Sequence, residues 1–99
     1  MEANIQEKII KAIMRVPGLV GLSNLDISKS GNKLKEEKYN KGITCVETSK
    51  GIIVKVFVVI SKNARVKTVS HEISKSIESV FRKTGNKIEQ ILIYVRGVE

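Results

Sequence analysis

The chain has 99 residues, of which 41% are hydrophobic and 28% are charged. This length and composition predict one folded domain over residues 1–99 and exclude a largely disordered protein. The single cysteine, Cys45, excludes an internal disulfide framework and favours a reducing, cytoplasmic location, while the formal net charge of +8 favours anionic partners.

The positive charge comes mostly from lysine, which supplies fourteen of the eighteen basic residues. Such a field attracts phosphate backbones, anionic lipid or an acidic protein partner. Specific phosphate recognition more often uses the forked guanidinium of arginine, and a lysine-rich composition is also typical of proteins from AT-rich genomes. The charge alone therefore leaves nucleic-acid binding open without selecting it.

No segment has the pattern of a membrane-spanning helix. The longest nearly apolar stretch, residues 52–60, contains Lys55 and is too short for a helix that crosses a bilayer. The first residues lack the basic start and the apolar run of a secretory signal, so we expect no such signal.

The first half of the chain predicts a helix, a strand and a loop. Over residues 4–16, apolar side chains recur every three or four residues, and Pro17-Gly18 ends this helix. Residues 19–27 have the composition of a strand. Residues 28–41 lose the apolar period and hold five lysines, so we predict an exposed basic loop there.

The second half predicts a hairpin, a helix and a strand. Residues 43–47 and 52–61 are β-branched runs on either side of a short turn that ends in a glycine, which predicts a hairpin. Residues 67–83 predict a second helix, and Gly85 suits the left-handed position after its end. The apolar stripe of this helix consists of Val66, Val69, Ile73, Ile77, Val80 and Phe81. A last strand is predicted over residues 87–96.

These elements predict an α/β (α+β) two-layer sandwich with the order α-β-β-β-α-β. The segment between the third and fourth strands is long enough for a right-handed crossover, which makes these two strands parallel and the four-stranded sheet mixed. Two helices with one apolar stripe each cover only one face of such a sheet. The predicted core face of the last two strands consists of Ile52, Val54, Val56, Val58, Ile60, Ile91, Ile93 and Val95.

The opposite face of the sheet carries a candidate interaction surface. Its members are Ile53, Lys55, Phe57, Val59, Leu92, Tyr94 and Arg96. An exposed apolar patch of this kind usually marks an interface, so a second copy or another protein is one expected occupant. Alternatively, Phe57 and Tyr94 stack nucleic-acid bases while the two cations hold phosphates. A third possibility is that the loop folds back over this face. We favour the self or partner interface, because two aromatic rings make a small stacking surface.

No set of residues predicts catalysis, a metal site or a cofactor site. His71 is the only histidine, so no histidine-based metal cluster is expected, and we predict that it faces solvent. Cys45 is interpreted as a small packing residue, since no base and orienting group accompany it. Gly18 and Gly21 have the spacing of the KH nucleotide clamp, but the apolar residues between them favour a turn. We therefore expect that the protein is not an enzyme.

Five segments carry a resemblance to a known family. They are VPGLVGL at residues 16–22, GITCV at 42–46, the apolar strand at 52–60, NARVKTV at 63–69 and ILIYVRGV at 91–98. In this order and spacing they resemble the signatures of the alkaline shock protein family, also called the Gls general-stress family, of the envelope stress response. Lys67 stands where many members have proline, and the charge of +8 replaces the acidic character common in the family.

The resemblance implies a single alkaline-shock-protein-like domain without catalytic or cofactor residues. Members of the family are abundant cytoplasmic bacterial proteins, and they often gather at the membrane through a membrane-anchored partner. The resemblance thus implies a small scaffold or adaptor of the cell-envelope stress response that self-associates and binds a membrane-anchored or acidic protein. A single-stranded nucleic acid remains the alternative partner.

Overall fold

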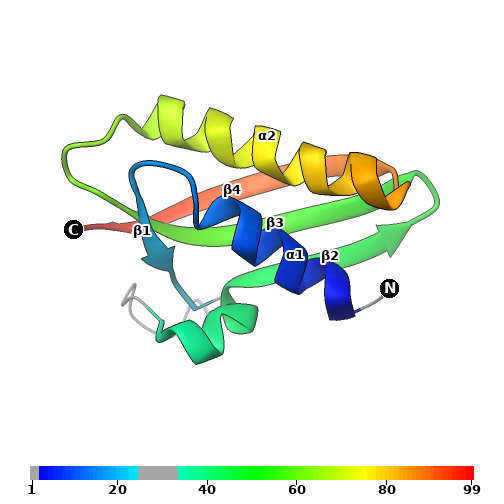
Figure 1. Cartoon of the computed structure of the whole chain (residues 1–99), viewed down its shortest axis with the longest axis horizontal. Coiled ribbons are helices and arrows are strands. Elements are labelled where there is room, and N and C mark those ends of the chain that lie inside the picture. Colours follow the sequence, from blue (N-terminus) through cyan, green and yellow to red (C-terminus); the bar gives the residue numbers. More distant parts are fainter. Residues whose placement is uncertain (1–2, 25–33) are drawn as a thin grey trace.

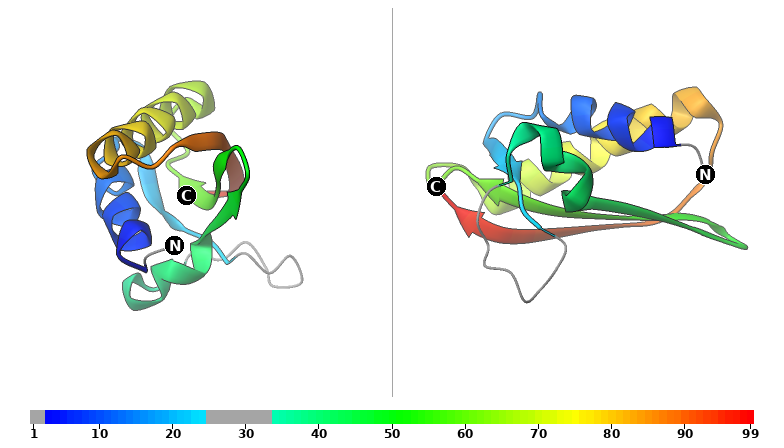
Figure 2. Two further views of the ribbon diagram at one scale, coloured as in Figure 1. Left: turned by 90° about the vertical axis from the view of Figure 1, so that its right-hand side faces the viewer. Right: turned by 90° about the horizontal axis from the view of Figure 1, so that it is seen from below.

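The computed structural model describes residues 3–24 and 34–99, and within them two helices lie over one face of a four-stranded sheet (Figure 1). The order of helices and strands is α-β-β-β-α-β, with a short 3-10 helix between the first two strands. This confirms the predicted fold class. Figure 2 shows the two layers from the side, with the helices on one side of the strands.

Helix α1 (Ala3–Ile13) ends three residues earlier than the predicted 4–16. The chain tightens after it: the Arg15 N–H donates to the Ala12 carbonyl at 3.3 Å, and the Val16 N–H donates to the Ile13 carbonyl at 2.9 Å. These bonds span three residues rather than four, which is the common way in which a helix closes before a proline. The prediction of the helix end was therefore wrong, although Val16 is still buried as expected.

Gly18 makes the turn from α1 into strand β1 (Leu19–Leu22) possible. Its φ angle is +92°, which side chains disfavour. A Cβ atom at this position would lie only 2.8 Å from Ala64 Cβ and 2.8 Å from Val69 Cγ2. Only a glycine therefore allows the chain to turn from α1 into β1 so close to Ala64 and Val69.

Strand β3 (Gly51–Ile60) is the centre of the sheet. Strand β4 (Ile88–Val98) runs parallel to it along one side, as the crossover predicts. On the other side, β2 (Ile43–Thr48) pairs antiparallel with the first part of β3, and β1 pairs antiparallel with its last three residues. The sheet is therefore mixed, and β1 and β2 share one side of the central strand.

Helix α2 (Val66–Thr84) joins β3 to β4 across the covered face. Gly85 follows it with a φ angle of +79°, and its N–H donates to the Phe81 carbonyl at 3.0 Å, so the predicted left-handed position is confirmed. The residues of the predicted stripe that are buried are Val69, Ile73, Ile77 and Phe81. Val66 was assigned to the stripe wrongly: it is 51% exposed, since it is the first residue of the helix at the end of the helical layer.

The core lies between the two helices and one face of the sheet. Its strand residues include the predicted even-numbered side chains of β3, with Ile91, Ile93 and Val95 of β4 packed partly buried against them. Helix α1 contributes Ile5, Ile9 and Ile13. The apolar periods of the helices and of β3 therefore meet in one cluster, as the sequence predicts.

The predicted basic loop over 28–41 is wrong for its second part. Residues 25–33, which include the end of the predicted first strand, lie outside the described residues. The 3-10 helix η1 (Glu36–Gly42) follows, and its Tyr39 is only 8% exposed. Leu34 packs against the core, and its N–H donates to the Leu22 carbonyl at 2.7 Å. Two apolar side chains thus anchor a segment whose lysines suggested a fully exposed loop.

Within the described residues, neither helix is long and apolar enough to cross a membrane.

Candidate interaction face

The face of the sheet that the helices leave uncovered carries the odd-numbered side chains of β3 and their neighbours on β2 and β4. The strand register places Ile53 between Val46 and Gln90, and it places Lys55 between Thr44 and Leu92. We call this surface the outer sheet face. It consists of Val46, Ile53, Lys55, Phe57, Leu92, Tyr94 and Arg96.

Two aromatic rings and an arginine form the centre of the outer sheet face. Phe57 and Tyr94 are register neighbours, and their rings stack with centroids 4.8 Å apart and planes 20° apart. The Arg96 guanidinium carbon lies 5.6 Å from the centroid of the Phe57 ring, and its Nη1 donates to the Asn24 carbonyl at 3.4 Å. Such a stack contributes about 0.5–1.5 kcal/mol and an exposed cation–π contact about 0.5–1 kcal/mol. The three side chains therefore hold one another in a defined arrangement.

Most of the outer sheet face is accessible from solvent. Tyr94 is 41% exposed and Val46 is 48% exposed. The other five members are half-buried, and all five were predicted to have this position. They are Ile53, Lys55, Phe57, Leu92 and Arg96. The apolar and aromatic side chains among them form a patch that neither helix covers.

Val59 does not belong to this patch, although the sequence analysis placed it there. It is 1% exposed, so it presents no surface for a partner. Its register partners are Gly21 on β1 and Gly97 on β4, and both strand pairings shift register beside it. Val58 and Ile60 belong to the core cluster and Val59 does not, so the alternation along β3 continues, but Val59 is buried where both neighbouring strands shift register.

Val46 is a member of the outer sheet face that the sequence analysis did not name. It lies opposite Ile53 in the hairpin, because Thr48 pairs with Gly51 across the turn. This turn sets the register of the two strands. The short turn ending in glycine was thus the signal that could have identified Val46.

The residues considered for catalysis, metal binding or nucleotide binding lie in surroundings that do not favour these roles. Cys45 packs against the core, and burial raises the pKa of its thiol from 9.0 to about 11, which disfavours the nucleophilic thiolate. His71 is exposed on α2, as predicted. Gly18 lies in a turn and Gly21 in β1, rather than in a loop between two helices. In the ranges 3–24 and 34–99, no three His, Cys, Asp or Glu residues are grouped in a way that could hold a metal ion.

Two helices over one face of a mixed sheet, with an aromatic and arginine cluster on the other face, define a two-layer α+β domain with an open sheet face. The chain belongs to the family of alkaline shock protein 23, whose members have a cell envelope-related function. The family model matches residues 1–99. This confirms the resemblance carried by the five sequence segments.

Comparison with solved structures gives the same fold. The CTD of MamM in its copper form is 18% identical with a TM-score of 0.57, over 98% of this chain and 76% of that chain. A nickel form of a MamM CTD variant is 18% identical with a TM-score of 0.57, over 99% of this chain and 100% of that chain. A cadmium form of another MamM CTD variant is 18% identical with a TM-score of 0.57, over 100% of both chains. At this identity the likeness concerns the fold alone. No curated protein matches the sequence.

Proposed function

We propose that the protein is a non-enzymatic scaffold or adaptor of the cell-envelope stress response that acts through protein–protein contacts of its outer sheet face. The observation that carries this proposal is the patch around Phe57, Tyr94 and Arg96, which is ordered by mutual contacts but not covered by either helix. Family membership supports the envelope-related part of the proposal. The expected partners are a second copy and a membrane-anchored or acidic protein, and the expected location is the cytoplasm.

The geometry of the aromatic pair favours a protein partner over a nucleic acid. A base that stacks on a protein needs an aromatic ring with a free face. Phe57 is already stacked on Tyr94 and lies under the Arg96 guanidinium, so a base would have to displace one of these contacts or use Tyr94 alone. Protein interfaces, by contrast, commonly use tyrosine and arginine on an apolar background.

Self-association is tested by sedimentation velocity over a concentration series of the full chain. We expect a concentration-dependent dimer, and we expect Tyr94→Ala to weaken its association about tenfold or more, because a central aromatic anchor is commonly worth more than 1 kcal/mol. The matched control is Val66→Ala, which also shortens an exposed apolar side chain but on α2.

Two results would contradict the self-association. One is a monomer at every concentration. The other is an equal loss in Tyr94→Ala and Val66→Ala, which would move the interface away from the outer sheet face. Circular dichroism of both variants verifies that they are folded.

The second candidate function is the binding of single-stranded nucleic acid, which the presence of Lys55 and Arg96 beside two rings favours. This function requires affinity for an RNA oligonucleotide that falls steeply with salt and falls further in Lys55→Ala. A fluorescence anisotropy titration at two salt concentrations measures both effects. Affinity that is weak at low salt and equal in the variant excludes it.

A further inference from the structure

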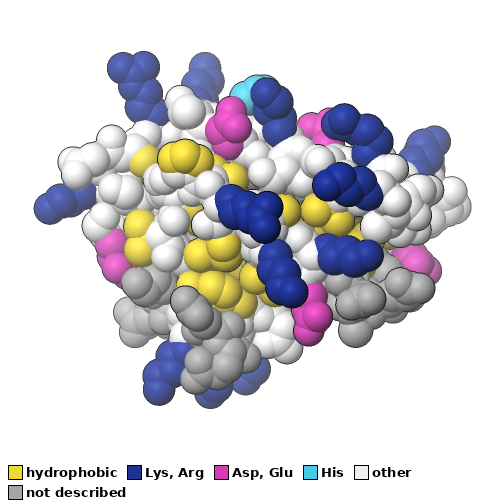
Figure 3. All heavy atoms as spheres, viewed as in Figure 1, with side chains coloured by type: hydrophobic (Ala, Val, Ile, Leu, Met, Phe, Trp, Pro, Cys, Tyr) yellow, Lys and Arg dark blue, Asp and Glu magenta, His cyan; other side chains and the backbone are white. Residues whose placement is uncertain are grey.

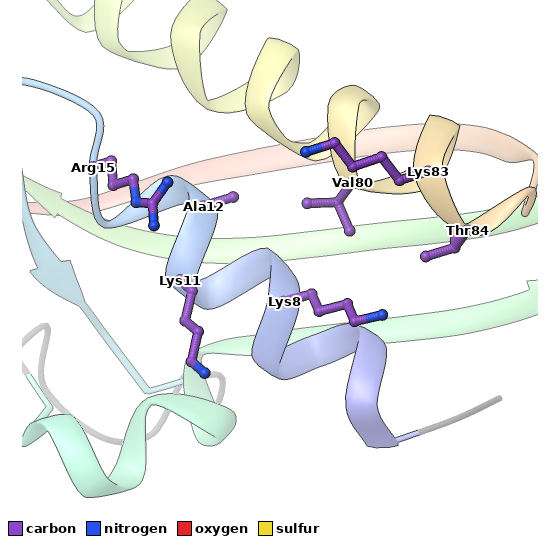
Figure 4. A pocket seen from close by; sticks show the side chains of 7 residues that line it. All are labelled: Lys8, Lys11, Ala12, Arg15, Val80, Lys83 and Thr84. Atoms are coloured by element: carbon purple, nitrogen blue, oxygen red, sulfur yellow. The ribbon is translucent and has the colours of Figure 1, made fainter.

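A basic groove lies on the opposite side of the molecule, between α1 and α2. Its volume is about 300 Å³, and Figure 4 shows the side chains that line it. They are Lys8, Lys11, Ala12, Arg15, Val80, Lys83 and Thr84. Lys8 and Lys11 lie on α1, Arg15 lies in the turn that follows it, and Lys83 comes from the last turn of α2. Helix packing therefore brings together cations that are far apart in the sequence.

Among the side chains that the structure describes, the four cations have no anionic partner. None of the seven residues that line the groove is acidic. Within 3–24 and 34–99, no hydrogen bond or ion pair joins the charged ends of these four side chains to the protein. Four like charges around one groove repel one another, and an anion in the groove relieves this repulsion.

Apolar surface accompanies these charges. Ala12 and Val80 lie between the cations of the groove, and a second hollow on the other side of α1 is lined by Ile10, Met14 and Tyr39 together with Lys11 and Arg15. Figure 3 shows this face of the molecule, with Lys and Arg side chains around hydrophobic surface near its centre. Cations on long apolar stems beside apolar hollows suit the headgroup region of a membrane, where phosphates and less polar groups alternate.

We propose that this groove binds the phosphate headgroups of an anionic lipid surface, so that the helical layer lies against the bilayer and the outer sheet face points away from it. The two layers lie on opposite sides of the molecule in Figure 2, so both surfaces can be occupied at once. The seven lining residues include no aromatic ring on which a base could stack, which distinguishes the groove from a single-strand binding site. The proposal uses none of the residues of the proposed protein interface.

The experiment is co-sedimentation of the full chain with vesicles. One set contains phosphatidylcholine alone, and the other contains in addition roughly 30% phosphatidylglycerol. We expect binding only to the anionic vesicles and its loss at about 1 M salt, where charges more than about 3 Å apart are screened.

A variant of the groove tests the site. Replacing the four cations by glutamine is expected to weaken vesicle binding about 100-fold or more, since each basic residue near an anionic surface contributes about fivefold. The matched control removes the same charge from exposed lysines that do not line the groove. These are Lys50→Gln, Lys62→Gln, Lys67→Gln and Lys87→Gln. The control is expected to lose much less, and circular dichroism verifies that both variants are folded.

Four outcomes would overturn the proposal. The first is an equal loss in the two charge variants, which would show a field effect of the net charge rather than a site. The second is binding to the neutral vesicles. The third is a preference for a single-stranded RNA or an acidic peptide over the anionic vesicles, lost in the groove variant. The fourth is competition by inorganic phosphate at equal phosphate concentration, which would show a site for the free ion instead of a lipid surface. Tyr94→Ala is expected to bind the vesicles normally, so failure of this proposal and failure of the sheet interface are separate results.

Discussion

The two faces of strand β3 carry similar side chains in different surroundings. On the covered face, Ile52, Val54, Val56 and Val58 are all buried in the core. On the outer sheet face, Ile53 and Phe57 are half-buried although they are just as apolar. The difference comes from the helices, whose apolar stripes are sufficient for only one face of the sheet. An apolar residue in this strand therefore supports stability on one face and is available for a partner on the other.

The largest difference is expected between a lysine on the covered face of β3 and a lysine on its outer face. Val54→Lys buries an ammonium group between Cys45 and Ile91 without a partner charge, and should cost about 4 kcal/mol or more, enough to unfold most of the protein. Ile53→Lys can extend its charge into water and should cost less than about 1 kcal/mol. Guanidinium denaturation monitored by circular dichroism measures both. Similar losses would mean that the outer sheet face is covered in solution.

Two aromatic residues give the next comparison. Phe81 is buried on the core side of α2, so Phe81→Ala should cost about 3–5 kcal/mol through lost burial and a cavity. Tyr94→Ala loses mainly the stack on Phe57 and should cost about 1 kcal/mol. Thermal unfolding at low protein concentration, where association does not contribute, measures the two losses. A larger loss of stability for Tyr94→Ala than for Phe81→Ala would contradict the exposure of the outer sheet face to solvent.

Two glycines with positive φ angles, each following a helix, differ in how closely other atoms approach them. Gly18→Ala introduces a methyl group only 2.8 Å from Ala64 and Val69 at a positive φ angle, and should cost about 2–4 kcal/mol. Gly85→Ala also has a positive φ angle, but no atom lies within 4 Å of the added carbon, so it should cost about 1–2 kcal/mol. Urea denaturation midpoints give the order, and equal midpoints would argue against the close approach at Gly18.

The smallest effect on stability is expected from a comparison of two thiols on opposite faces of β2, at positions 45 and 46, whose alkylation rates differ. Because burial raises the pKa of Cys45 to about 11, its alkylation should accelerate with each pH unit above 8 and level off only near pH 11. In the background Cys45→Ala, the variant Val46→Cys presents an exposed thiol on the outer sheet face. Its alkylation at pH 8 should be about 100-fold faster, the ratio of thiolate fractions for a shift of two pKa units. Equal rates would show that the covered face opens readily.

The strands and helices with strong periodicity could be predicted from the sequence. The hairpin of β2 and β3, the stripe of α2 and the parallel pairing of β3 with β4 all follow from local patterns and the handedness of crossovers. The same patterns placed Phe57 and Tyr94 on one face, because side chains alternate along a strand. The strand register then makes Phe57 and Tyr94 neighbours, and this neighbourhood is sufficient for their rings to stack.

Other features depend on contacts that no local pattern contains. Val59 is buried beside the register shifts of both strand pairings, and Tyr39 is buried because η1 packs against the core. No local pattern shows that Lys8, Lys11 and Arg15 form one groove with Lys83 of α2, because the groove depends on how the two helical segments pack.

The amino-acid order was sufficient for the elements, their sequence along the chain, the family and the existence of one open apolar face, because alternation and helical periodicity are properties of neighbouring residues. The packing of distant segments decided which side chains of that face remain accessible, how Arg96 sits over Phe57, and that four cations from α1, the turn after it and α2 surround one groove. These depend on register shifts and on interhelical contacts, in which residues far apart in the chain determine each other's surroundings.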